Sequence, residues 1–275
     1  MFGYSSRLLA SKLLDTIFQH IYHAVIGRIY SSALLGYYTR AKMLEQLPAN
    51  TLSRMINSVT FPVFSTIQND RARVKRAVRK TLTTLALVNF PMMIGLALVA
   101  KPLVLLLLTE KWLPCVPYLQ LMCVVGLTYP LHVVNINLLK SLGRSDLFFR
   151  IAIFRKILII ANIALTYRWG IEAMLIGQMG VALVGYYINT YYTGILIQYS
   201  MREQVLDVIP YLGITGIMGI CMYAVQSFLS VDSVVILATQ IATGFIVYSV
   251  LCKILNFAAF IDLLGVIKSR PHFKV

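Results

Sequence analysis

The sequence has few charged residues, and acids are especially scarce. Of its 275 residues, 13% are Asp, Glu, Lys or Arg, with ten acids against 25 bases, and 59% are hydrophobic. A soluble domain usually carries about a quarter charged residues. The scarcity of charge therefore argues against an ordinary soluble domain and predicts an all-α integral membrane protein.

The sequence also lacks the short motifs of catalysis and metal binding. There is no P-loop, no GxSxG elbow and no HExxH pair, and the few acids offer no paired carboxylates at a common depth. The cysteines show no metal-ligand spacing and are expected to be buried and inert; they are Cys115, Cys123, Cys221 and Cys252. We therefore expect no enzyme, no catalytic residue, no cofactor and no metal site.

The excess of basic residues gives a formal net charge of +15. In a soluble protein this charge would suggest nucleic acid. Here the bases gather between apolar stretches, above all in NDRARVKRAVRK at Asn69–Lys80. Such a run predicts a cytoplasmic loop that fixes membrane orientation. The expected partners are membrane lipids with anionic headgroups, and no nucleic acid.

About eight stretches approach the roughly 20 residues needed to cross a membrane. The fifth ends at Tyr167 and extends back through Phe148. The other seven are Leu13–Leu35, Leu47–Gln68, Thr81–Thr109, Pro117–Leu142, Ile171–Ile197, Val208–Phe228 and Val234–Leu255. Prolines within or beside several spans suit a transporter whose bundles rock, and they can also be static kinks.

One threading places most bases on the same side of the membrane. The inside segments are the N-terminus with Arg7 and Lys12, Asn69–Lys80, the zone around Arg144, the Arg202 loop and the tail. The expected outside loops are Gly36–Gln46, Thr109–Val116, Arg168–Gly170 and Ser230–Ser233. The outside loops are far less basic, which satisfies the positive-inside rule.

Polar side chains follow one face of each of the first two spans at helical spacing. The candidates that we single out are Asp15, Gln19 and His23 on the first span and Asn50, Arg54 and Asn57 on the second. Such groups usually face a bundle interior or a wet cavity, and the alternative is interhelical hydrogen bonding alone. For Arg54 we favour the cavity, because it lies about 5 Å from the middle of its predicted span, a long way to snorkel.

The fifth span carries Arg150 and Arg155 beside Lys156. These bases either snorkel to cytoplasmic headgroups or line the inner half of a cavity that attracts an anionic substrate. The last two spans are almost purely apolar and are expected to be scaffold.

Four strings resemble a known family: LLGYYTRAKMLEQLP, FPVFSTIQNDRARVKRAVRK, LLTEKWLPCVPYLQLM and LKSLGRSD. They resemble the polysaccharide-transporter branch of the multidrug/oligosaccharidyl-lipid/polysaccharide exporters, and the resemblance covers about Phe2 to Ile197. It implies two helical lobes around a cavity, and alternating access that moves an undecaprenyl-diphosphate-linked oligosaccharide across the bacterial inner membrane. The chain resembles the second half of such a transporter, and where many members carry an acid it has Tyr22 and His23 in YHAVIG.

We therefore expect residues 1–200 to form one lobe, a six-helix bundle, and residues 201–275 to add two spans and a cytoplasmic tail. The expected function is flipping a lipid-linked oligosaccharide for lipopolysaccharide or exopolysaccharide synthesis. Further expected partners are a separate N-terminal half or polysaccharide-assembly proteins. The alternatives are a small-molecule exporter, a membrane glycosyltransferase or polymerase, and a purely structural subunit.

Overall fold

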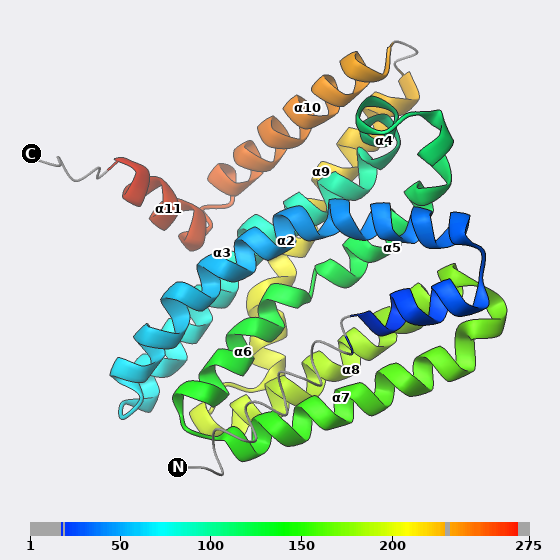
Figure 1. Cartoon of the computed structure of the whole chain (residues 1–275). Helices are drawn as coiled ribbons and strands as arrows, with labels where there is room; N and C mark the ends of the chain where they lie inside the picture. Colours follow the sequence, from blue (N-terminus) through cyan, green and yellow to red (C-terminus); the bar gives the residue numbers. More distant parts are fainter. Residues whose placement is uncertain (1–17, 19, 229–231, 269–275) are drawn as a thin grey trace, which may run out of the picture.

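The computed structural model describes residues 18, 20–228 and 232–268, which are mostly helical with no strand among them. Residues 20–29 form a first helical segment (Figure 1). The elements that follow are α2 (Ser32–Ile67), α3 (Arg71–Leu98), α4 (Ala100–Leu107), η1 (Glu110–Cys115), α5 (Val116–Gly126), α6 (Tyr129–Ser141), α7 (Ser145–Thr166), η2 (Tyr167–Trp169), α8 (Ile171–Ile197), α9 (Met201–Phe228), α10 (Ser233–Ile254) and α11 (Ala258–Lys268).

Five helical segments in the described part of the chain are long and apolar enough to cross a membrane. They are α3, the run Glu110–Ser141, α8, α9 and Ser233–Ile254. The chain is thus an all-α, multi-pass membrane protein, as predicted. The remaining predicted spans, the first, second and fifth, are the three in which we singled out ionisable residues. The count of about eight stays a prediction.

The boundary between the first two spans was predicted wrongly. The expected outside loop Gly36–Gln46 lies within α2, a continuous helix of 36 residues that begins after the N-cap Ser31 and includes both Pro48 and Pro62. The segment TRAKMLEQ before Pro48 consists mostly of strong helix formers, which favours continuation of the helix. At 1.5 Å per residue α2 is about 54 Å long, more than the roughly 30 Å of a hydrocarbon core.

The basic stretch is also helical rather than a loop. Asp70 caps α3 by accepting a hydrogen bond from the backbone N–H of Arg73 at 3.0 Å. Three bases on the following turns form ion pairs with acids far along the chain: Lys75 with Glu203, Arg79 with Asp207, and Lys80 with Asp262. Part of the predicted topogenic charge is therefore paired with acids of α9 and α11.

The connections between helices gather at two opposite ends of the bundle (Figure 1). The α2–α3, α6–α7 and α8–α9 connections lie at one end, and η1 and η2 lie at the other. Three of the basic segments that were predicted to lie on one side of the membrane thus share one end of the bundle. The side of the membrane that this end faces stays a prediction. Arg7, Lys12, Arg270 and Lys274 lie outside the described residues. The predicted tail contains a helix that we did not expect, α11.

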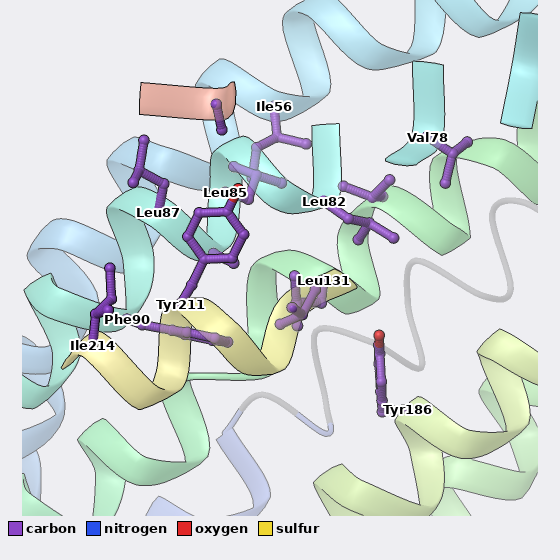
Figure 2. Close-up of a cluster of buried hydrophobic side chains, with 14 of the residues drawn as sticks. Ile56, Val78, Leu82, Leu85, Leu87, Phe90, Leu131, Tyr186, Tyr211 and Ile214 are labelled. Carbon is purple, nitrogen blue, oxygen red and sulfur yellow. The ribbon is translucent and has the colours of Figure 1, made fainter. Parts of the chain in front are cut away.

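Apolar side chains of α3, α6 and α9 form a shared core (Figure 2). Leu82, Phe90, Leu131 and Tyr211 are all buried in it. The α5–α6 break next to this core exposes backbone carbonyls, and buried Asn89 satisfies two of them by donating to Gly126 O and Leu127 O at 3.2 and 3.0 Å. An unpaired carbonyl is costly in a membrane, so this amide stabilises the break.

Candidate substrate-facing site

Three of the predicted site residues lie together on α2. Asn50, Arg54 and Asn57 are exposed and follow one another at helical spacing. With Ser53 on the same helix and Tyr129 at the start of α6 they line an open hollow of about 430 Å³. The hollow is large enough for a polar group and several waters.

Arg54 carries the uncompensated charge of this hollow. Its Nε donates to Asn50 O at 3.4 Å, within its own helix, and no carboxylate among the described residues pairs with it. Arg54 lies about 7 Å from the middle of α2 along the axis. An exposed guanidinium is unfavourable against lipid tails but favourable in a wet cavity or beside an anion.

Asn57 has a second role that sequence reasoning left open. Asn137 on α6 donates through Nδ2 to Asn57 Oδ1 and to Thr60 Oγ1, both at 2.8 Å. Asn57 therefore joins α2 to α6 by hydrogen bonding, as membrane helices commonly do, while it also lines the hollow.

His23 is not brought to the hollow. Its ring lies edge-on to Tyr38 on α2, with 5.0 Å between centroids, and it also lies near His20. Tyr38 is about 24 Å from Arg54 along α2. The other two candidates on the first span, Asp15 and Gln19, lie outside the described residues.

The bases of α7 also stay apart from the hollow. Arg150 is exposed, and Arg155 is half-buried with its aliphatic part close to Gly185 on α8. His132 lies at the same place; its Nδ1 accepts from Asn189 and its Nε2 donates to Ala182 O, both at 3.0 Å. Lys156 is buried, so this base does not extend freely toward headgroups.

Sequence reasoning missed a buried acid on α2. Glu45 is 5% exposed, and its Oε2 accepts from Lys42 Nζ at 2.9 Å. Its other oxygen lies near Gly126, where an added Cβ would be 3.3 Å away. Lys42 and Glu45 have the three-residue spacing of a helical ion pair, a signal that was hidden because the segment was predicted as a loop.

Tyr22 is placed by a neighbouring amide. Asn162 on α7 donates through Nδ2 to Tyr22 Oη at 2.9 Å and to Met174 O at 3.0 Å. This one side chain links the segment at residues 20–29 to both α7 and α8. Among the described residues, no group of three or more His, Cys, Asp or Glu could hold a metal ion.

Comparison with known proteins gives one family match and several relatives. Residues 1–117 match the family described as "Polysaccharide biosynthesis protein". The lipopolysaccharide biosynthesis protein WzxC of Escherichia coli (strain K12) is 30% identical over 199 residues, which is 72% of this chain and 39% of that protein. No solved structure matches the chain significantly.

Two further relatives have similar roles by name. The teichuronic acid biosynthesis protein TuaB of Bacillus subtilis (strain 168) is 30% identical over 54% of this chain and 31% of its own length. The succinoglycan biosynthesis transport protein ExoT of Rhizobium meliloti (strain 1021) is 27% identical over 66% of this chain and 38% of its own length. The chain thus spans well under half the length of these relatives. It is a relative of the polysaccharide-transporter family that its sequence resembles.

Proposed function

We propose that this chain is one lobe of a flippase that moves an undecaprenyl-diphosphate-linked oligosaccharide across the bacterial inner membrane. It acts as a transporter and not as an enzyme. The observation that carries the proposal is the exposed, unpaired Arg54 near the middle of α2, in a hollow otherwise lined by hydroxyl and amide groups.

The chemistry of the hollow suits such a substrate. A guanidinium forms strong, charge-assisted hydrogen bonds with phosphate oxygens. Asn50 and Asn57 offer amides that donate to and accept from sugar hydroxyls. A single uncompensated positive charge attracts a diphosphate electrostatically.

The aligned part of the chain covers 39% of its E. coli relative, and the family that the sequence resembles implies two helical lobes. Asn50 and Arg54 are exposed on α2, so in a transporter they would face the other lobe across a hydrated path. Alternating access needs two bundles that rock around a site between them. We propose that residues 1–200 form the rocking lobe, that residues 201–275 support it, and that an N-terminal half supplies its partner.

The proposal is tested by polysaccharide export in a flippase-null strain that expresses the chain together with the N-terminal half of a matched relative. Arg54→Ala is expected to abolish export at unchanged membrane abundance, and Arg54→Lys to retain part of it, because the charge survives and the planar fork is lost. Arg40→Ala is the matched control, since Arg40 is an exposed arginine of α2 that stacks on Trp112 outside the hollow. Equal losses of abundance and export in Arg54→Ala would show that Arg54 is structural.

A further inference from the structure

A second hollow lies at the end of the bundle where the α2–α3, α6–α7 and α8–α9 connections meet (Figure 1). Its volume is about 220 Å³. Its polar lining is Gln68, Arg71 and Arg144, and its apolar lining includes Val74, Leu142 and Leu196. Gln68 is about 21 Å from Arg54 along α2, so this hollow is separate from the candidate substrate-facing site.

Arg71 provides positive charge that no described acid neutralises. It is the first residue of α3, where the unpaired backbone N–H groups and the helix dipole also favour an anion. The neighbouring acid Asp70 is already engaged, because it accepts from Arg73 N at 3.0 Å and pairs with Arg73 Nε at 3.5 Å. Among the described residues no carboxylate pairs with Arg71.

Arg144 reaches the same hollow from the α6–α7 connection. Its Nε and one terminal nitrogen donate to the two oxygens of Asp146, both at 3.1 Å. This bidentate pair holds the guanidinium plane in place. The other terminal nitrogen of Arg144 has no hydrogen-bond partner among the described residues, so it can still donate. No carboxylate side chain lines the hollow.

The geometry points to a binding site for the phosphate group of a membrane lipid, held between Arg71 and Arg144. Two guanidinium groups and an amide match the oxygens of a phosphate, and the aliphatic lining suits the glycerol or prenyl carbons next to it. The hollow is too small for a whole lipid, so the tails would lie outside it. The site takes either an anionic phospholipid or a polyprenyl diphosphate, and only the second source rests on the proposed function.

Native mass spectrometry of the purified full-length chain measures this binding directly, with phosphatidylglycerol and undecaprenyl diphosphate as probes. Arg71→Gln and Arg144→Gln are each expected to weaken binding of the preferred lipid about tenfold or more, because each removes charge-assisted hydrogen bonds. Arg76→Gln is the matched control; it removes an exposed arginine of α3 that does not line the hollow, and binding should not change.

Asp146→Asn separates a binding role of Arg144 from a structural one. The asparagine keeps one acceptor oxygen that can position Arg144 and removes the negative charge that neutralises it, so affinity for the phosphate lipid should rise. If undecaprenyl diphosphate binds more tightly than phosphatidylglycerol, the site belongs to the transported class of lipids. If phosphatidylglycerol binds more tightly, the site holds a resident membrane lipid. Equal lipid binding by the wild type, Arg71→Gln and Arg144→Gln would overturn the site. If the wild-type chain binds the lipid but supports no export together with an N-terminal half, only the proposed function is overturned.

Discussion

Asn137 on α6 and Asn57 on α2 are joined by a hydrogen bond of 2.8 Å at the edge of the hollow that contains Arg54. Asn57 therefore has two roles, since it contributes to the packing of α2 against α6 and exposes an amide to the hollow.

A double-mutant cycle on Asn57→Ala and Asn137→Ala measures the first role. We expect a coupling of about 0.6 kcal/mol, and not above about 1.7, as found for interhelical hydrogen bonds in membranes. The measurement is reversible unfolding in mixed micelles. Asn50→Ala is the control, because the Asn50 side chain makes no hydrogen bond to another described residue and only its backbone oxygen accepts one; the free energy of unfolding of this variant should equal that of the wild type. Additive single-mutant effects would show that the bond contributes nothing.

The ion pairs between α3 and the C-terminal helices should differ in strength. Asp207 has a side chain only 12% exposed, pairs with Arg79 and accepts from Tyr199 Oη at 2.6 Å, whereas Asp262 and its partner Lys80 are both largely exposed. Asp207→Asn is therefore expected to lower the free energy of unfolding by about 1–3 kcal/mol. Asp262→Asn should have little effect, as exposed pairs do. Equal losses in the two variants would contradict this ranking.

Gly177 on α8 leaves space for the amide of Asn162. A Cβ at Gly177 would lie 1.7 Å from Asn162 Oδ1, whereas a Cβ at Gly180 meets nothing within 4 Å. Gly177→Ala must displace the side chain that bonds Tyr22 and Met174, so we expect a loss of about 1–3 kcal/mol. Gly180→Ala should cost nothing, because alanine favours helix. The measurement is thermal unfolding of the two variants in the same detergent. Equal midpoints for Gly177→Ala and Gly180→Ala would contradict the prediction.

The orientation of the bundle is tested by thiol labelling in intact cells. With Cys115, Cys123, Cys221 and Cys252 replaced, single cysteines at Ala72 and Ser145 should resist a membrane-impermeant reagent, and one at Lys111 should react. The first two positions lie at the basic end of the bundle and the third lies in η1 at the opposite end (Figure 1). Reaction at Ala72 from outside would reverse the orientation and place the Arg71–Arg144 hollow in the wrong leaflet.

Much of the fold could be predicted because apolar composition limits the choices in a membrane. The sixth span was predicted as Ile171–Ile197, the bounds of α8. The error at α2 arose because a polar segment with a proline resembles a loop, although its residues favour helix. The basic stretch Asn69–Lys80 was likewise predicted as a loop although most of it is helical. Its charge alone does not show whether its partners are solvent or the acids Glu203, Asp207 and Asp262.

The candidate site was predicted only in part, because helical spacing reveals faces but not which faces meet. Helical spacing grouped Asn50, Arg54 and Asn57, and these three residues line one hollow in the structure. It could not show that Asn137 would engage Asn57, since that contact joins residues 80 positions apart. Whether the grouped residues touch substrate stays a prediction.

The central claim is that this chain supplies one lobe and needs another. In a flippase-null strain, export of surface polysaccharide should be absent with this chain alone and should appear when the N-terminal half of a matched relative is also expressed, at equal abundance of the chain. Robust export from the chain alone would contradict the account, and would direct attention to a homodimer in which a second copy replaces the missing lobe.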